Sequence, residues 1–362
     1  MRNLLLAFDG TWQKTDSDFS DGDQNSHVVQ IVQALQDSVT ETPQIVHYLP
    51  GVGTSAWQQI RGGIFGWGLS DKIAEAYLWL MEHYQAGDRI FLVGYSRGAF
   101  AARSLSGLID RLGLLRLENL EKFDACYQLY RRGTRREQNR FKAQFSTSIQ
   151  IEAIAVWDTV GSLGIPLGSF KQLNRYLWGF HDTRLASNVK RGFQALAIDE
   201  HRADFIPTLW SPKLEAYQCV EQRWFAGSHG DIGGGTDSSL SQYSYQWVVE
   251  SLIHSGLQLN ANSLASQSLS FELPHDSFEE FLGGLYDWFT DRHLRPIGAC
   301  QNRFETIDPS VFELMSNSDY RPKNRVGAHL FSYLPNKLCE IDYLYQFQTC
   351  FLDEEEGILN AS

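Results

Sequence analysis

A serine between two glycines is the residue of this sequence best suited to nucleophilic chemistry. Gly94, Ser96 and Gly98 fit the G-x-S-x-G pattern, with the apolar run 90–93 before it and small residues at 99–102 after it. These flanks predict a strand and a helix joined by a tight turn, the context of a nucleophile elbow. Such a turn exposes the serine hydroxyl, and the helix N-terminus directs its N–H groups and positive dipole end at a developing oxyanion. The alternative is a buried serine that caps the helix.

A serine hydroxyl needs a base within reach and a carboxylate that orients that base. His229 stands directly after a late predicted strand, 220–226, in a glycine-rich turn with room for a substrate. Asp158 directly follows the predicted strand 149–157, so the order Ser, acid, His holds along the chain. Asp231 is the rival acid, although its closeness to His229 suits it better to bracing the loop. The alternatives are a histidine satisfied within its turn and an aspartate that caps the next turn.

An oxyanion hole needs one N–H from the residue after the nucleophile and another from a neighbouring strand end. Arg97 is in the first position, and Gly10 and Thr11, after the first predicted strand, are candidates for the second. Asp9, at the tip of that strand, either faces the site or braces its own turn. The guanidinium of Arg97 could meet a phosphate or carboxylate of the substrate, or pair with Asp9 or Asp158.

Alternating strands and helices must position these residues. Predicted strands at 4–8, 45–49, 90–93, 149–157 and 220–226 are interleaved with predicted helices at 28–35, 71–84, 99–115 and 243–254, whereas 194–202 predicts a helix or its end. This alternation predicts an α/β fold with a mostly parallel central sheet and helices on both faces. We expect one domain over residues 1–362, with a core at about 1–260, a helical insertion at 117–146, a lid or cap loop at 162–182 and a C-terminal covering region at 261–362.

Charge excludes some classes of partner. The formal net charge is −12, which argues against a nucleic-acid-binding surface and weakens electrostatic docking to anionic lipid. A local basic run lies within the predicted insertion, and we interpret it as the solvated face of a helix instead of a binding site. It consists of Arg131, Arg132, Arg135, Arg136 and Arg140.

Cysteine usage and apolar runs bear on the compartment. The five cysteines are widely spaced and form no C-x-x-C, so we expect no disulfide framework, no zinc or other metal site, no cofactor, and a reducing compartment. The apolar run 4–8 is too short for the core of a signal peptide, and no run of about 18 apolar residues occurs. The sequence therefore predicts a cytoplasmic protein, unless it is exported by a route without a signal peptide.

Six motifs, taken together and in this order, resemble one known family. They are FDGTW (8–12), YLPGVGT (48–54), GDRIFLVGYSRGAFAARSLSGLI (87–109), AVWDTVGSLG (155–164), ALAIDEHR (195–202) and WFAGSHGDIGGG (224–235). The family is the uncharacterised α/β-hydrolase family called domain of unknown function 2235, which includes the phospholipase effectors of bacterial type VI secretion, first lipase class. The resemblance implies an α/β-hydrolase fold and serine esterase or lipase chemistry. By motif position it marks Ser96 as the nucleophile and Asp158, His229 and Asp231 as site residues.

One departure from the family pattern keeps an alternative open. The family's later His-Pro-Ser-Val motif corresponds here to residues 308–311, which begin with Asp308. If that histidine is the family's base, this chain lacks it and is a catalytically inactive, hydrolase-fold binding protein. A Ser96–His229 distance well beyond hydrogen bonding would favour that alternative. Acyl transfer to an acceptor other than water is a further alternative.

The favoured prediction is a carboxylic-ester hydrolase that works through a Ser96–His229–Asp158 triad and an acyl-enzyme. An aromatic-rich cover indicates an apolar acyl group, so a lipid or other apolar ester is the expected substrate, as for a lipase, phospholipase or esterase. Such a substrate implies transient contact with a membrane surface. The sequence does not indicate the oligomeric state. The aromatic residues of the cover are Phe65, Trp67, Trp178 and Phe180.

Overall fold

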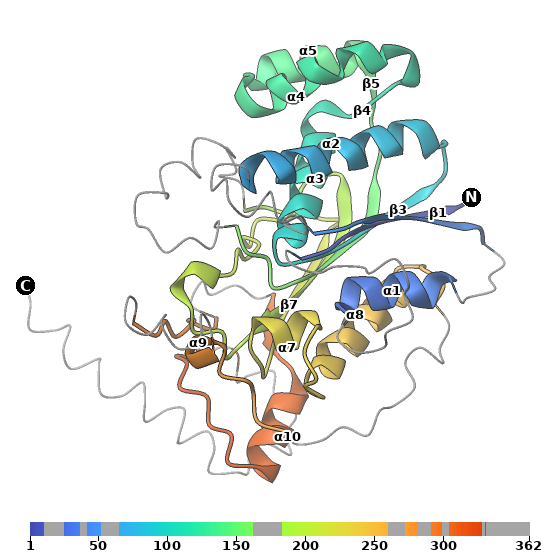
Figure 1. Ribbon diagram of the computed structural model, residues 1–362. Coiled ribbons are helices and arrows are strands. Elements are labelled where there is room, and N and C mark those ends of the chain that lie inside the picture. The colour runs from blue at the N-terminus through green and yellow to red at the C-terminus, as the bar shows by residue number, and fades with distance from the viewer. Residues whose placement is uncertain are drawn as a thin grey trace, which may run out of the picture.

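A seven-stranded sheet forms the centre of the molecule (Figure 1). The structure, a computed structural model, describes residues 1–10, 25–36, 42–51, 65–161, 183–259, 272–280, 291–298, 304–327 and 330. The strand order is β2-β1-β3-β6-β7-β8-β9, and every neighbouring pair is parallel. The strands are β1 (Asn3–Phe8), β2 (Gln44–Leu49), β3 (Arg89–Tyr95), β6 (Ile151–Trp157), β7 (Val189–Ala197), β8 (Cys219–Phe225) and β9 (Glu305–Ile307). Because the strands are parallel, the residues that follow them meet at one edge of the sheet.

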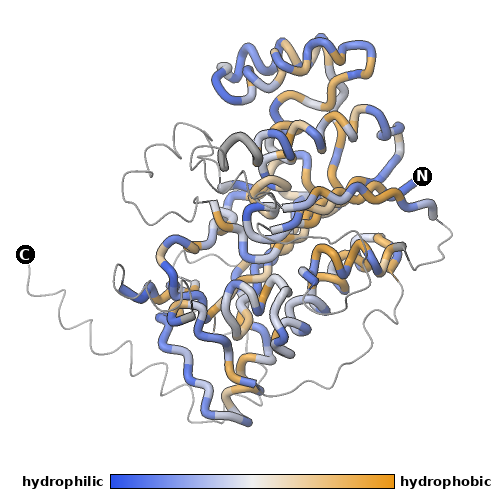
Figure 2. The backbone as a smooth tube through the Cα atoms, in the orientation of Figure 1, coloured by the Kyte–Doolittle hydropathy of each residue, from blue (hydrophilic) through white to orange (hydrophobic). Residues whose placement is uncertain are grey.

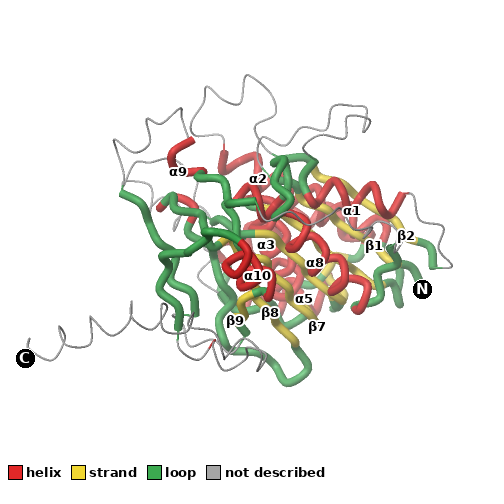
Figure 3. Tube along the Cα trace, turned by 90° about the horizontal axis from the view of Figure 1, so that it is seen from below, coloured by secondary structure: helices red, strands yellow, loops and turns green. Residues whose placement is uncertain are grey.

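Helices cover both faces of this sheet, as the α/β prediction requires (Figures 1 and 3). Strand β1 illustrates why, because its side chains alternate between two cores. Leu4 and Leu6 belong to the core under α2 and α3, whereas Leu5 and Ala7 belong to the core under α1 and α8. The sheet is therefore buried on both sides. The helices are α1 (His27–Gln36), α2 (Phe65–His83), α3 (Arg97–Leu112) and α8 (Ser241–His254).

The charged insertion predicted at 117–146 is helical and lies on the outer side of α3 (Figure 1). A short antiparallel ladder closes its base, and Thr134 and Glu137 form a capping box at the start of its last helix. Figure 2 shows that the strands are mainly apolar, whereas hydrophilic and hydrophobic residues are mixed along the insertion. Its elements are β4 (Leu114–Leu115), η1 (Leu117–Lys122), α4 (Phe123–Arg132), α5 (Arg135–Phe145) and β5 (Ser146–Thr147).

Two parts of the chain differ from the sequence-based expectation. Residues 194–202 do not form a helix: they are the end of β7 and the loop after it. Alanines in this stretch favour a helix locally, but a strand buried on both faces loses the alternation that identifies strands, and the tertiary context decides. The C-terminal region also does more than cover the fold. It adds β9 to the sheet beside β8 and the helix α10 (Pro309–Asn317).

Several expected features fall outside the described residues. These are Thr11, the loop 162–182, and the side chains of Phe65, Trp67, Trp178 and Phe180. In the part of the chain that the structure describes, no group of three or more His, Cys, Asp or Glu residues is arranged to hold a metal ion. None of the described helices combines the length and the apolar character needed to cross a membrane.

Candidate active site

Ser96 occupies a strained turn between β3 and α3. Its backbone has φ 56° and ψ −119°, a conformation that non-glycine residues rarely adopt. The two glycines of the motif permit this turn. A Cβ on Gly98 would lie 2.2 Å from the carbonyl oxygen of Phe8, and one on Gly94 would lie 2.8 Å from the Cα of Ala99. The sequence G-x-S-x-G is therefore needed here because α3 packs directly against β1 and β3.

His229 and Asp158 reach the same point from two other strand ends. His229 is the first residue of α7 (His229–Gly233), just after β8, and Asp158 directly follows β6. His229 Nε2 lies 2.9 Å from Ser96 Oγ, and His229 Nδ1 lies 2.6 Å from Asp158 Oδ2. A carboxylate only accepts, so the Nδ1 proton is donated to Asp158 and Nε2 is left to accept from the serine. All three side chains are buried.

Asp158 is held as a charged group inside the protein. It is fully buried and has a backbone φ of 40°, again in the left-handed region. Burial alone would raise the pKa of this carboxyl, but the Arg295 guanidinium and His229 outweigh it and hold the pKa below its usual value. Arg295 donates from Nη1 to Oδ1 at 2.7 Å and from Nη2 to Oδ2 at 2.9 Å. The carboxylate therefore stays ionised and fixed in orientation.

The imidazole of His229 is fixed by its neighbours as well. The rings of Tyr95 and Phe205 lie 4.9 and 5.0 Å from it, centroid to centroid. Tyr95 also donates through its hydroxyl to the His229 carbonyl at 3.1 Å. The buried carboxylate of Glu200 accepts from the His229 backbone N–H at 3.3 Å and from the side chain of Arg202 at 2.7 and 2.8 Å. These contacts hold the ring on the line between Ser96 and Asp158.

Asp231 contacts other groups. It accepts from the backbone N–H of Ser228 at 2.9 Å and lies 2.9 Å from Nδ1 of His275. Ser228 and Thr236 also donate their hydroxyls to it. Asp231 thus braces the loop that carries His229, and in the described geometry Asp158 is the carboxylate bonded to the His229 ring.

The residues proposed for the oxyanion hole lie near the turn after β1. The Gly10 N–H donates to Asp9 Oδ1 at 2.7 Å, and the Tyr48 hydroxyl donates to Asp9 Oδ2 at 2.7 Å. Burial raises the pKa of Asp9, partly offset by these hydrogen bonds. Asp9 and Arg97 line the same small hollow, and burial lowers the pKa of Arg97 to about 10. In this structure the Gly10 N–H is therefore already engaged in a hydrogen bond to Asp9.

Residues 2–251 match the model of a family described as the type VI secretion phospholipase effector Tle1-like catalytic domain. The chain belongs to this Tle1-like family. The resemblance seen in the sequence motifs is confirmed.

Individual relatives are more distant. An uncharacterized protein of Saccharomyces cerevisiae is 28% identical over 239 residues, which cover 58% of this chain and 33% of the yeast protein. Among solved structures, an uncharacterized protein from Pseudomonas aeruginosa has a TM-score of 0.45 and 18% identity, over 74% of this chain and 48% of that one. The Tle1 effector bound to the VgrG spike of the type 6 secretion system has a TM-score of 0.39 and 16% identity, over 66% of this chain and 51% of that one. The chain thus spans about a third of the yeast protein and about half of each of these two structures.

Asp308, the residue on which the inactive-protein alternative rests, has a structural role. It caps α10 by accepting from the Ser310 N–H at 2.9 Å, and its other oxygen lies 3.2 Å from Arg223 Nη1. The Ser96 hydroxyl already lies at hydrogen-bond distance from an imidazole, that of His229. The large Ser96–His229 separation that would favour the inactive-protein alternative is not observed.

Sequence reasoning missed two residues of this site. Arg295 lies in the stretch 291–298, which has no regular element and no periodic pattern, so nothing local marks it as the partner of Asp158. Glu200 could have been found, because the ALAIDEHR motif follows a strand end of the same sheet as Asp158 and His229. Reading that segment as a helix hid this position.

Proposed function

We propose that this Tle1-like protein is a serine hydrolase of carboxylic esters, with Ser96 as nucleophile, His229 as base and Asp158 as the orienting acid. The observation that carries the proposal is the 2.9 Å contact between Ser96 Oγ and His229 Nε2, with Asp158 at 2.6 Å on the other ring nitrogen. The same constellation of hydroxyl, imidazole and carboxylate recurs in acyl-transfer enzymes on unrelated folds. The description of the matched family supports a phospholipid or other lipid ester as the substrate class.

Acylation begins when Ser96 Oγ attacks the acyl carbon and gives its proton to His229 Nε2. The imidazolium that forms is stabilised by the ionised Asp158, whose charge Arg295 maintains. The bond between the acyl carbon and the alkoxy oxygen then breaks, and the leaving alcohol takes the proton from His229. Water, activated by the same imidazole, cleaves the acyl-enzyme and restores the Ser96 hydroxyl.

The tetrahedral oxyanion needs donors near the start of α3. The backbone N–H of Arg97 is the first candidate, because it belongs to the residue after the nucleophile at the N-terminus of a 16-residue helix. Gly10 can contribute only if its N–H exchanges the Asp9 carboxylate for the oxyanion. Protonation of Asp9, whose pKa burial raises, would make that exchange easier.

Active-site labelling tests the proposal directly. A fluorophosphonate probe is expected to modify Ser96 in the wild-type protein, identified by mass spectrometry, and to leave Ser96→Ala unlabelled. Hydrolysis of p-nitrophenyl esters and of a phospholipid panel is expected to fall on the order of 10⁶-fold in kcat for Ser96→Ala. Ser104→Ala is a matched control, because Ser104 lies on α3 and donates to the Phe100 carbonyl. Full activity in Ser96→Ala would end the proposal.

A further inference from the structure

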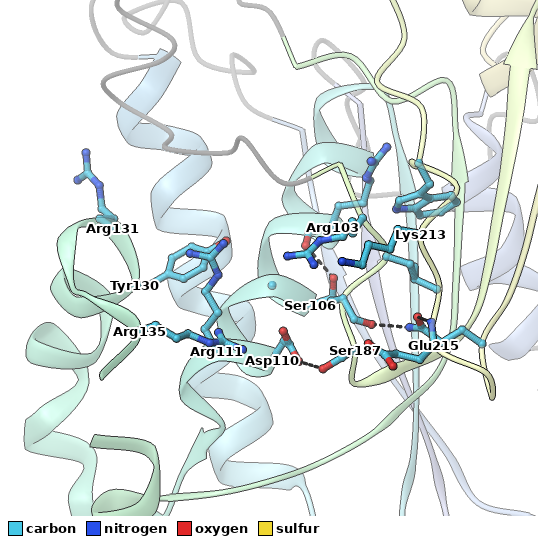
Figure 4. Close-up of a pocket in the computed structure, with 16 residues that line it drawn as sticks. Arg103, Ser106, Asp110, Arg111, Tyr130, Arg131, Arg135, Ser187, Lys213 and Glu215 are labelled. Carbon is cyan, nitrogen blue, oxygen red and sulfur yellow. Dashed lines mark hydrogen bonds between the residues drawn. The ribbon is translucent and has the colours of Figure 1, made fainter. Parts of the chain in front are cut away.

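A pocket of about 210 Å³ lies outside the proposed active site (Figure 4). It is enclosed by the second half of α3, the insertion helices α4 and α5, and the segments that precede β7 and β8. Ser96, Asp158 and His229 are not among its described lining residues. Pockets that enclose drug-sized ligands measure roughly 300–1,000 Å³, so this one suits a more compact group.

The lining of the pocket is strongly basic in a protein that is acidic as a whole. Its described lining residues include six cationic and two carboxylate side chains, which gives them a local charge of +4 against −12 for the chain. One of the carboxylates, Asp110, accepts a hydrogen bond from the Ser187 hydroxyl. The insertion supplies two of the cations, so its basic run is not only a solvated face. The cations are Arg103, Arg111, Arg131, Arg135, Arg184 and Lys213, and the second carboxylate is Glu215.

Three of these cations have no anionic partner among the residues that the structure describes. Among the described residues, Arg111, Arg135 and Lys213 form no ion pair with a carboxylate, although like charges gathered around one cavity repel each other. Arg111 instead lies over the ring of Tyr130, with 6.0 Å between its Cζ and the ring centroid. A mobile anion from outside the chain would relieve this repulsion.

One of the residues that line the pocket, Arg103, is a buried charged side chain. Its side chain is 3% exposed, its Cζ lies 4.7 Å from the Trp210 ring centroid, and Nη1 donates to the Thr208 carbonyl. Nη2 is buried and has no hydrogen-bond partner among the described residues. Burial lowers the pKa of Arg103 to about 9, which still leaves it charged at neutral pH. A buried guanidinium with an unused donor is costly to keep unless a ligand satisfies it.

We propose that this pocket binds a compact anion that carries a phosphate monoester. Arginine presents a planar fork of donors that matches the oxygens of phosphate, and several arginines converge here around a cavity too small for a large ligand. The ligand is either a soluble phosphate ester or the phosphate headgroup of a lipid, since both present the same group. Binding at this site does not depend on the proposed ester hydrolysis.

Binding to the Ser96→Ala protein tests the inference without any turnover of the probe. Glycerol 3-phosphate, measured by calorimetry, represents the soluble source, and phosphatidylcholine vesicles with a minority of phosphatidic acid represent the lipid source. Saturable binding of glycerol 3-phosphate, or vesicle binding that requires phosphatidic acid, is expected, with glycerol and pure phosphatidylcholine vesicles as blanks. Binding in neither arm would overturn the inference, whatever the outcome of active-site labelling.

Matched substitutions separate the pocket from general charge attraction. Arg111→Gln and Lys213→Gln are expected to weaken binding about tenfold each, because each removes a charged hydrogen-bond donor. Glu215→Gln is expected to tighten it, because a carboxylate at the rim is lost. Arg132→Gln and Arg136→Gln make the same charge change on α4 and α5 outside the lining, and should leave affinity within about twofold at physiological salt. Equal losses in the lining and control variants would contradict a specific site.

Discussion

Arg295 donates to both carboxylate oxygens of Asp158, and one of these oxygens also accepts from His229. The relationship joins a residue from the C-terminal part of the chain to the end of a central strand. Arg295 also donates to the Ala197 carbonyl at 2.8 Å, so it is anchored to the end of β7. Its guanidinium offsets the burial of Asp158, which would otherwise favour the neutral acid and weaken its support of an imidazolium.

Arg295→Gln is expected to reduce kcat and to shift the acidic limb of the pH–rate profile toward higher pH. The pKa of Asp158 is lower in the folded state than in the unfolded state, so its ionised carboxylate stabilises the fold at pH values above the unfolded-state pKa. That stabilisation is lost as the pH falls through the folded-state pKa. Without Arg295 that folded-state pKa rises, and the ionised form is lost at a higher pH. Removing one partner of a buried pair should also cost about 3–5 kcal/mol of unfolding free energy, measured by urea denaturation.

Arg292→Gln is the matched control for that substitution. Arg292 is close in sequence, but its ion pairs with Asp276 and Glu279 are largely exposed to solvent. Such pairs contribute about 0–1 kcal/mol. An unshifted pH profile in Arg295→Gln, or an equal effect in Arg292→Gln, would mean that Arg295 does not position Asp158.

Asparagine substitutions distinguish the two candidate acids. Asp158→Asn should lower kcat about 10⁴-fold, because the amide cannot hold His229 in the required tautomer or stabilise the imidazolium. Asp231→Asn should mainly lower stability, because it weakens the hydrogen bonds to Ser228 and His275. Kinetics with a p-nitrophenyl ester and urea denaturation of both variants give the comparison. A larger loss of kcat in Asp231→Asn would reverse the assignment.

The sequence predicts the parts of the fold that local patterns encode. The strand before Ser96 and the α3 helix are visible in apolar runs and in the G-x-S-x-G spacing, and Asp158 and His229 are predicted as site residues because strand ends of a parallel sheet converge. Strand β7 is missed because burial on both faces removes the alternation of polar and apolar residues that identifies a strand. Strand β9 is missed because its three residues are too few to show such an alternation. Arg295 is missed for another reason: its contact with Asp158 spans 137 residues and arises only from tertiary packing.

The strained backbone at Ser96 predicts a difference between two inactive variants. Ser96→Ala keeps a Cβ at φ 56° and so keeps the strain, whereas Ser96→Gly relieves it. Glycine loses more conformational entropy on folding, which offsets part of the gain. We expect Ser96→Gly to be more stable than Ser96→Ala by about 1 kcal/mol in urea denaturation. If Ser96→Ala were the more stable variant, the turn would not store the strain that its geometry indicates.

Asp199 is expected to make the stability of the fold depend on pH near neutrality. It is 8% exposed and accepts hydrogen bonds from the Gly227 N–H and the Tyr320 hydroxyl at 2.8 Å each. The charges of Asp231 and Arg295 also affect its pKa. Burial raises its pKa to about 7 from 3.8. The folded state then binds more protons than the unfolded state between these two values, so this group's contribution to stability is lost as pH rises through 7.

Asp199→Asn removes the titration and keeps an oxygen that can accept both hydrogen bonds. The difference in unfolding free energy between Asp199→Asn and wild type should therefore shift in favour of the variant by about 2–3 kcal/mol as the pH rises from 5 to 8. Tyr320→Phe should move the loss to higher pH, because the hydroxyl stabilises the charged carboxylate. Urea denaturation across this pH range measures both effects, and parallel pH curves for Asp199→Asn and wild type would show that Asp199 does not titrate there.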